Sequence, residues 1–170
     1  GVGALGCMSA DMLARAGVGT ITLIDRDIVE FTNLQRQVLF TEQDAETHQP
    51  KATAAASRLC AINSSIEIRP YVEDLSQKNV DRLLKDADII IDGLDNFNTR
   101  YILNDYAVKN NKPFLFAGVI AGSGNVMTII PNETPCLRCL FPEPPPSGSQ
   151  ETCDTAGVIA PAVGIAASCQ

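Results

Sequence analysis

The chain has 170 residues, 45% of them hydrophobic and 19% charged, which is typical of one globular domain that can bury a sizeable core. Twenty acidic and 13 basic side chains give a formal net charge of −7, which argues against a nucleic-acid-binding protein because such proteins usually carry a basic face. No apolar run approaches the roughly 18–20 residues of a membrane span and no signal peptide is visible, so we predict a single cytoplasmic domain over residues 1–170.

In chain order, the pattern alternates between helix and strand. Gly17 ends the first predicted helix, Pro50 opens the second and Ser76 caps the third. Alternating strands and helices predict an α/β fold with a doubly wound, Rossmann-like, mostly parallel sheet and helices on both faces. The predicted elements are a glycine turn at 1–6, helices at 7–16, 50–62, 77–85 and 98–110, and strands at 20–24, 66–72, 87–91, 112–117 and 126–131.

A glycine-rich turn with the spacing Gly1-x-Gly3-x-x-Gly6 opens the first helix. Glycines let the backbone approach a phosphate closely, and a helix N-terminus adds free N–H groups and the positive end of the helix dipole. Asp25 follows Gly6 by 19 residues, at a strand end where a carboxylate can accept hydrogen bonds from ribose hydroxyls. The pair predicts nucleotide binding, against the alternative of a structural turn and a surface aspartate, and does not choose between NAD and ATP.

Three further side chains suit a triphosphate and its metal. Arg36 and Lys51 are candidates to neutralise phosphate charge, and Asp95 follows the buried strand 87–91 as a candidate Mg²⁺ ligand. The carboxyl ends of parallel strands bind the ligands of such folds, so we expect Asp25 and Asp95 to lie near the glycine turn. Read singly, Arg36 and Lys51 could be surface cations, and Asp95 with Asn96 could simply cap the next helix.

Seven segments in the same order resemble the ThiF/MoeB/HesA family, which is related to the enzymes that activate ubiquitin. Together they span essentially the whole chain. They are Gly1-Val2-Gly3-Ala4-Leu5-Gly6, Leu23-Ile24-Asp25-Arg26-Asp27, Asn33-Leu34-Gln35-Arg36-Gln37, Gln49-Pro50-Lys51, Asp92-Gly93-Leu94-Asp95-Asn96, Pro135-Cys136-Leu137-Arg138-Cys139 and Thr152-Cys153-Asp154-Thr155-Ala156-Gly157-Val158.

The resemblance implies which residues form an ATP site. Asp95 binds Mg²⁺ and supports attack on the α-phosphate, with Asn96 alongside, and Asp25 holds the ribose. The other implied contacts are the backbone of Gly1, Gly3 and Gly6, and the side chains of Asn33, Arg36 and Lys51 on the triphosphate.

The resemblance also implies a reaction and its partners. The reaction is ATP-dependent adenylation of the C-terminal Gly-Gly carboxylate of a ubiquitin-like sulfur-carrier protein of the ThiS or MoaD type, with release of pyrophosphate. It serves thiamine or molybdopterin biosynthesis. Family members are usually homodimers, and in some an arginine from the partner's N-terminal segment completes the ATP site. We expect that family segments before Gly1, including a first strand, and after Gln170 are missing from this chain.

The six cysteines are scattered rather than arranged as the disulfide framework of a small secreted protein, which favours a cytoplasmic protein with a metal or a reactive thiol. Cys136-x-x-Cys139 can supply half of a tetrahedral zinc site. The resemblance implies a second Cys-x-x-Cys beyond Gln170, so a structural Zn²⁺ is expected in the intact protein. Two free or structural cysteines are the alternative.

Cys153 lies after a proline-rich stretch, where a thiol could be accessible. The resemblance implies that it attacks the acyl-adenylate or takes part in sulfur transfer, although adenylation itself does not require it. The other three cysteines are expected to pack in helices: Cys7, Cys60 and Cys169.

Two rival functions are compatible with a nucleotide-binding turn. An NAD-dependent oxidoreductase would leave Arg36, Lys51 and Asp95 without a role, and it needs a proton-transfer residue, whereas the sole histidine, His48, lies in a polar loop. A non-catalytic subunit of a heterodimeric activating enzyme would have no need of the same three charged side chains. Adenylation is therefore the preferred prediction, with Arg36, Lys51, Asp95 and Cys153 as its catalytic candidates.

Overall fold

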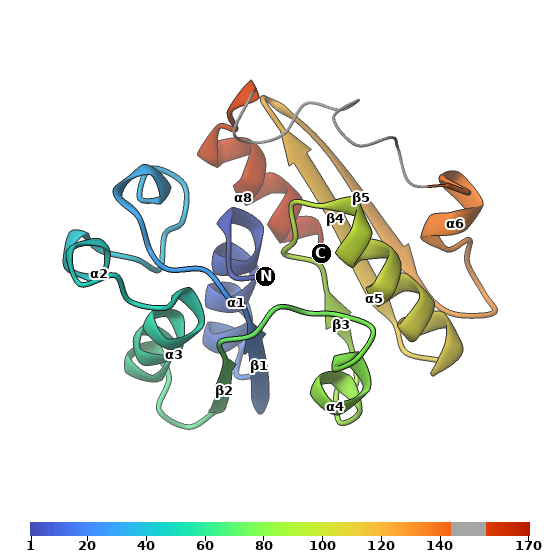
Figure 1. Ribbon diagram of the computed structural model, residues 1–170, viewed down its shortest axis with the longest axis horizontal. Coiled ribbons are helices and arrows are strands. Elements are labelled where there is room, and N and C mark those ends of the chain that lie inside the picture. Colours follow the sequence, from blue (N-terminus) through green and yellow to red (C-terminus); the bar gives the residue numbers. More distant parts are fainter. Residues whose placement is uncertain (144–155) are drawn as a thin grey trace.

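The computed structural model describes residues 1–143 and 156–170 (Figure 1). Its strands are β1 (Thr20–Ile24), β2 (Glu67–Tyr71), β3 (Ile90–Ile91), β4 (Phe114–Ile120) and β5 (Ser123–Ile129). Its helices are α1 (Ala4–Ala16), the 3-10 turn η1 (Phe31–Asn33), α2 (Glu42–Glu46), α3 (Lys51–Ile62), α4 (Val80–Leu84), α5 (Phe97–Lys109), α6 (Leu137–Leu140) and α8 (Ala160–Cys169). Among the described helices, none is long and apolar enough to span a bilayer.

The strands form two separate sheets. β1 and β2 pair in parallel from Thr20 opposite Glu67 to Ile24 opposite Tyr71. In the second sheet β3 pairs in parallel with β4, and β4 pairs with β5 in an antiparallel hairpin. Only residues 121–122 join β4 to β5, which is too short for the crossover that a parallel pair needs. The predicted α/β class with mostly parallel strand pairs is confirmed, and the hairpin is its one antiparallel pair among the described strands.

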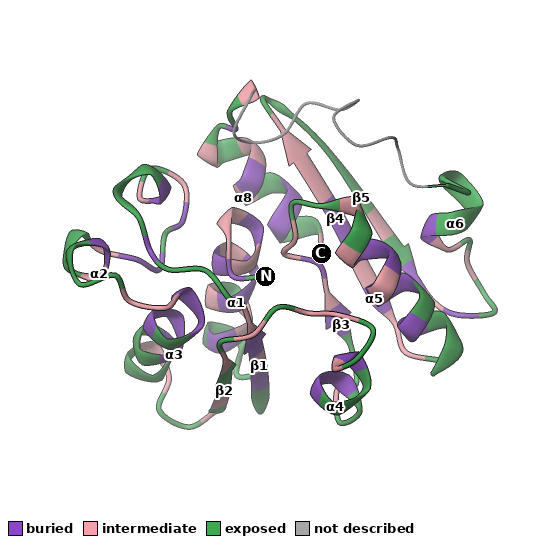
Figure 2. Cartoon of the chain, viewed as in Figure 1, coloured by how far each residue is buried: buried purple, intermediate pink, exposed green. Residues whose placement is uncertain are grey.

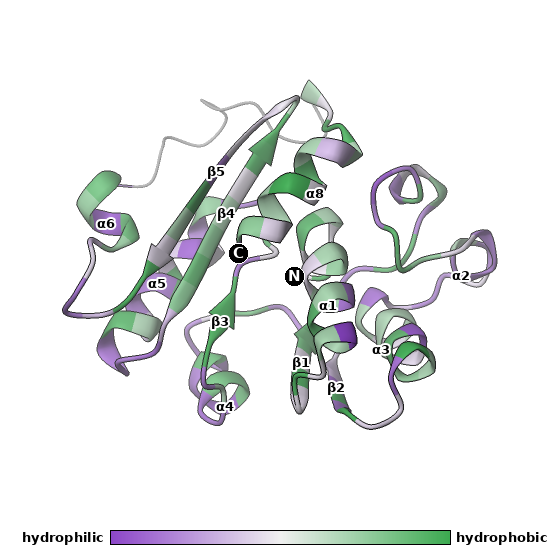
Figure 3. Cartoon of the chain, turned by 180° about the vertical axis from the view of Figure 1, so that it is seen from behind, coloured by the Kyte–Doolittle hydropathy of each residue, from purple (hydrophilic) through white to green (hydrophobic). Residues whose placement is uncertain are grey.

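Helices cover both faces of β4, as predicted, because its side chains alternate between two cores. Phe114 and Phe116 point into a cluster with α5, whereas Ala117 points into a cluster with Val163 of α8. The views from the two sides place α5 and α8 on opposite faces of this strand (Figures 1 and 3).

Small side chains pack α1 against α3 and β1. Ala10, Ala14, Ala52 and Ala55 are buried there, so the helices approach closely, and each helix turns its buried stripe inward (Figure 2). Gly17 ends α1 in the left-handed conformation, at φ 82°, as the sequence predicts.

Two predicted elements are shorter than expected. The strand predicted over 87–91 is reduced to Ile90–Ile91, because β4 is its only partner in the described structure and its other edge borders a cleft. The helix predicted over 77–85 begins at Val80, because Asn79 occupies the N-cap position and Ser76 donates its N–H and hydroxyl to Asn79 Oδ1. The short elements η1, α2 and α6 were not predicted.

Candidate functional site

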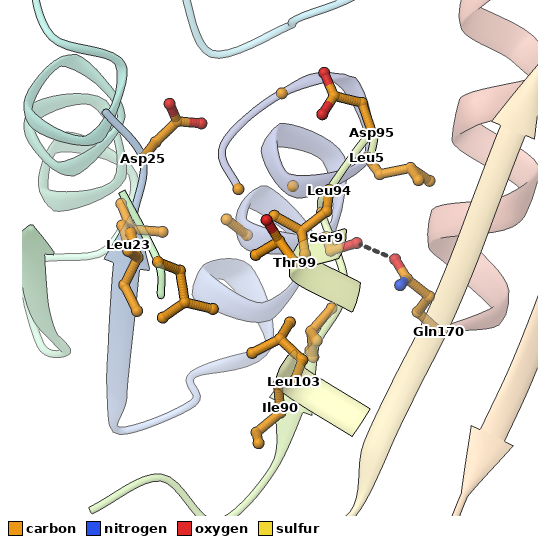
Figure 4. A pocket seen from close by; sticks show the side chains of 18 of the residues that line it. Leu5, Ser9, Leu23, Asp25, Ile90, Leu94, Asp95, Thr99, Leu103 and Gln170 are labelled. Atoms are coloured by element: carbon orange, nitrogen blue, oxygen red, sulfur yellow. Dashed lines mark hydrogen bonds between the residues drawn. The ribbon is translucent and has the colours of Figure 1, made fainter. Parts of the chain in front are cut away.

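A cleft of about 2430 Å³ runs between the two sheets, along β1 and β3 and as far as their carboxyl ends. Its polar part contains the glycine turn, with Asp25 on one side and Asp95 on the other (Figure 4). Its apolar part is lined by side chains such as Leu23, Ile90 and Leu103. The prediction that the glycine turn, Asp25 and Asp95 share one edge of the fold therefore agrees with the structure.

The glycine turn fits tightly against the loop that follows β3. A Cβ atom on Gly1 or on Gly93 would overlap the other residue's carbonyl oxygen, and a Cβ on Gly6 would overlap the Gly1 carbonyl oxygen. Gly3 is the N-cap of α1, whose first turn offers N–H groups toward the cleft. Glycine is needed here for close approach of two backbones, and the sequence alone assigned Gly93 no role.

Asp25 anchors the glycine turn to the end of β1. Its Oδ2 accepts a hydrogen bond of 2.7 Å from the Val2 N–H, and its Oδ1 accepts one of 2.9 Å from the Asp27 N–H. Each carboxylate oxygen has two lone pairs, so both oxygens keep capacity for a further donor such as a ribose hydroxyl.

Both predicted cations line the cleft. Lys51, at the start of α3, is only 8% exposed, and its Nζ lies 3.2 Å from Asp27 Oδ2. Arg36 is half-buried and donates from Nη1 to the Thr32 carbonyl oxygen at 2.9 Å. Buried and backbone-anchored cations suit the recognition of a highly charged anion, so the reading of Lys51 as a surface cation is wrong.

Asn33 and Asn96 shape their own loops. Asn33 Oδ1 accepts the Glu30 N–H at 3.1 Å, which closes η1 beside the cleft. Asn96 is the N-cap of α5, since its Oδ1 accepts the Thr99 N–H at 2.9 Å, as the capping alternative expected. Asp95 is exposed, and its hydrogen bond within the described structure comes from Asn96 Nδ2 at 3.3 Å. Its carboxylate therefore has ample capacity for a cation.

Gln37 is a second residue of the cleft that the sequence analysis did not single out for a role. The side chain is only 4% exposed, lines the cleft beside Gly3, and its Oε1 has no hydrogen-bond partner within the described structure. A buried acceptor without a partner costs about 1–3 kcal/mol, so a ligand donor would relieve it. Residue type and spacing in the sequence do not predict that a buried oxygen will lack a hydrogen-bond partner.

The cysteine pair lies outside this cleft. Cys136 is the N-cap of α6 and Cys139 lies within that helix, with their Sγ atoms 3.8 Å apart. Two thiolates bound to tetrahedral zinc at ~2.3 Å are separated by about 3.8 Å, so the pair fits half of such a site. Partial burial acts to raise the pKa of Cys136, but hydrogen bonds from the Cys139 and Arg138 backbone lower it overall. Residues 1–143 and 156–170 supply no cluster of three metal ligands.

The other cysteines differ in their burial. Cys7 is fully buried, as expected. Cys60 and Cys169 are exposed, so the packing prediction is wrong for both, because each lies on the solvent side of its helix. Cys153 lies outside the described residues.

Comparison with known proteins gives one consistent picture. The model of the ThiF family matches residues 1–170. The chain is 50% identical over 163 residues to the sulfur carrier protein ThiS adenylyltransferase of Bacillus subtilis, covering 96% of this chain and 48% of that protein. It is 40% identical to the sulfur carrier protein adenylyltransferase of Thermus thermophilus, covering 96% of this chain and 62% of that protein.

Solved structures agree with these relatives. The crystal structure of E. coli MccB with ATP matches 99% of this chain and 51% of that chain, with a TM-score of 0.84 and 28% identity. The chain thus spans about half the length of several of the proteins that it matches.

Proposed function

The chain belongs to the ThiF family, and from that premise we propose that it forms the ATP site of an enzyme that adenylates a ubiquitin-like sulfur-carrier protein. The observation that carries the proposal is that one cleft contains the glycine turn, the Asp25 and Asp95 carboxylates and two cationic side chains. The cations are those of Arg36 and Lys51. Relatives named as adenylyltransferases of sulfur-carrier proteins support the substrate class.

In this proposal the nucleotide lies across the glycine turn. Asp25 accepts the ribose hydroxyls while its bonds to Val2 and Asp27 hold it in place. Arg36 and Lys51 contact the triphosphate, and the limited exposure of both side chains strengthens these contacts because it reduces screening by water.

The reaction needs orientation and charge stabilisation more than proton transfer. An oxygen of the carrier's terminal carboxylate forms a bond to the α-phosphorus, the bond from that phosphorus to the bridging oxygen breaks, and pyrophosphate leaves with the electron pair. The carboxylate is already a nucleophile at neutral pH, so no general base is required. Asp95 is the residue that would hold Mg²⁺, whose contribution is to neutralise phosphate charge.

Pyrophosphate exchange tests the proposal. With the full-length protein, labelled pyrophosphate should enter ATP only when a carrier ending in Gly-Gly is present. Asp95→Asn should lower the exchange rate by about 100-fold or more, since it removes a charge-stabilising group. Glu46→Gln, a matched loss of one exposed carboxylate on α2, should leave it unchanged. Absence of exchange with both a ThiS-type and a MoaD-type carrier would sink the proposal, and comparison of the two carriers assigns thiamine or molybdopterin biosynthesis.

We further propose that Cys136 and Cys139 bind a structural Zn²⁺ together with two ligands outside the described residues. The 3.8 Å separation of their sulfurs supports this. Full-length protein should contain about one zinc per chain, and a Cys136→Ser and Cys139→Ser double variant should lose it. Retention of the metal by that variant would contradict the site.

Three further expectations complete the proposal. Cys153 attacks the acyl-adenylate carbonyl with loss of AMP, so mass spectrometry should find a carrier thioester that Cys153→Ser abolishes.

The protein is a homodimer, which light scattering of the full-length protein would measure. It acts in the cytoplasm, which cell fractionation would examine.

A further inference from the structure

A buried ion pair lies directly beneath the loop that presents Asp95. Asp92, at the end of β3, is 0% exposed, and Arg100, on α5, is 6% exposed. Arg100 Nε donates to Asp92 Oδ2 at 3.0 Å. Asp92 does not line the cleft, and Arg100, which does, directs its guanidinium hydrogen bonds to Asp92 and to the backbone of Leu94 and Ala117.

The same two side chains clamp the backbone of Leu94, the residue before Asp95. Asp92 Oδ1 accepts the Leu94 N–H at 2.8 Å, and Arg100 Nη2 donates to the Leu94 carbonyl oxygen at 2.6 Å. Arg100 Nη2 also donates to the Ala117 carbonyl oxygen at 2.9 Å, which ties the clamp to β4. Both polar groups of one peptide residue are therefore held by a single ion pair.

The loop is also fixed on its other sides. Asn96 caps α5 immediately after Asp95, and Gly93 packs against the backbone of Gly1 and Gly6. Because the residues on both sides of Leu94 and Asp95 are held in place, a shift of Leu94 would move Asp95 relative to the glycine turn.

Stability alone is a weak explanation for this arrangement. Burying two charges costs several kcal/mol per ion, and well-packed apolar residues of similar volume often stabilise a core equally well. The Arg100 guanidinium already lies between apolar rings, 5.5 Å from the centre of Phe97 and 5.1 Å from that of Phe116, which an apolar side chain could fill. What an apolar pair could not do is hold the Leu94 N–H and carbonyl.

We propose that Asp92 and Arg100 are positioning residues that set the location of the Asp95 carboxylate above the glycine turn for a divalent cation. This inference rests on the proposed function and deepens it, because it assigns metal affinity to residues that touch neither metal nor substrate. Residues that orient a metal ligand commonly change metal affinity about 10–100-fold when mutated.

The test uses the full-length protein with a non-hydrolysable ATP analogue and Mn²⁺ as the metal probe. Free Mn²⁺ is followed by its electron paramagnetic resonance signal, and analogue binding without metal is followed by calorimetry. Arg100→Lys keeps the charge but loses the fork that reaches both Asp92 and Leu94. Its Mn²⁺ dissociation constant should rise about tenfold or more, while metal-free analogue affinity stays within about twofold. Arg15→Lys, which alters an exposed ion pair with Asp11, should change neither value.

Asp92→Asn is the second variant. Asparagine has the same size and shape as aspartate, so the Mn²⁺ dissociation constant of this variant tests the proposal even if Arg100→Lys does not fold. A lower melting temperature with an unchanged Mn²⁺ constant would overturn the proposal and leave the pair with a structural role. Pyrophosphate exchange by the wild-type protein separates failure of this inference from failure of the proposed function. If the wild type exchanges pyrophosphate but both variants bind Mn²⁺ as tightly as the wild type, only this inference is wrong. If the wild type does not exchange pyrophosphate, the proposed function is wrong.

Discussion

Three carboxylates in or beneath the cleft differ in how many hydrogen bonds they already accept from the protein. Asp92 is fully committed to Arg100 and Leu94, and Asp25 accepts two backbone N–H groups. Asp95 accepts one long bond from its neighbour Asn96 within the described structure. Complete burial raises the pKa of Asp92, which the Arg100 guanidinium opposes. The three residues thus suit three different tasks: holding a loop, holding a neutral hydroxyl and holding a cation.

At Gln37, replacement should separate ligand binding from stability. Gln37→Leu removes the buried Oε1 that lacks a partner, so the free energy of unfolding should stay the same or rise by up to about 1–3 kcal/mol. Affinity for ATP should fall about 2–10-fold, the equivalent of one lost hydrogen bond. Denaturant titration and calorimetry measure the two effects. Gln35→Leu, an exposed position in the same segment, is the control, and equal ATP affinity in both variants would refute the role of Gln37.

The thiols should differ sharply in reactivity. Burial raises the pKa of Cys7 from 9.0 to about 12, so at pH 8 only about one molecule in ten thousand carries the thiolate. Cys60 and Cys169 are exposed. Brief alkylation of the native protein followed by peptide mapping should find both of these modified and Cys7 unmodified, with Cys7 reacting only in denaturant. Labelling of native Cys7 at a comparable rate would show that α1 opens readily.

At the scale of elements, α6 is attached to α5 by the buried Leu137 side chain and by several polar contacts. Arg138 forms a two-pronged ion pair with Asp105, and its guanidinium lies 4.7 Å from the centre of the Tyr101 ring. Asn104 Oδ1 accepts the Leu137 N–H at 2.8 Å. These contacts orient the turn that carries Cys136 and Cys139.

The attachment of α6 should weaken in acid. Hydrogen bonds from Arg138 lower the pKa of Asp105 below its ordinary 3.8, so its stabilising contribution is complete above 3.8 and is lost as pH falls through the lower, folded-state value. The difference in melting temperature between wild type and Asp105→Asn should therefore shrink as the pH drops from 5 to 3. A difference that is constant over this range would show that the ion pair does not stabilise the fold, as holds for many half-exposed pairs.

At the scale of the whole molecule, the main feature is the separation of the two sheets. β1 and β3 each have one strand partner within the described structure, and the apolar part of the cleft lies between their other edges. We propose that a β-strand joined to Gly1 pairs with β1 and β3 and makes one continuous sheet.

Extending the chain should test this directly. An apolar strand of five residues added before Gly1 should raise the melting temperature by at least about 5 °C, since two or three buried aliphatic side chains each contribute about 1.5–3 kcal/mol. An extension with alternating serine and glycine is the control, and equal melting temperatures for the two extensions would refute strand insertion.

Local patterns explain how far prediction from the sequence could go. The α/β class, the helix that Gly17 ends and the chain positions of Asp25 and Asp95 follow from periodicity, capping and strand order, which nearby residues encode. The lengths of β3 and α4 were predicted less well, because a strand's extent depends on its partners and a helix start depends on competing side chains such as Ser76 and Asn79.

By itself, the sequence determined that a glycine turn and an acidic strand end would meet at one edge of an α/β sheet, since both features are requirements of the local backbone. Only the tertiary structure decided that Gly93 must be small, that Gln37 has a buried oxygen without a partner, and that Arg100 holds the loop of Asp95. Those facts depend on segments tens of residues apart coming within hydrogen-bond distance, and the free energy of such contacts depends on burial, which residue spacing does not record.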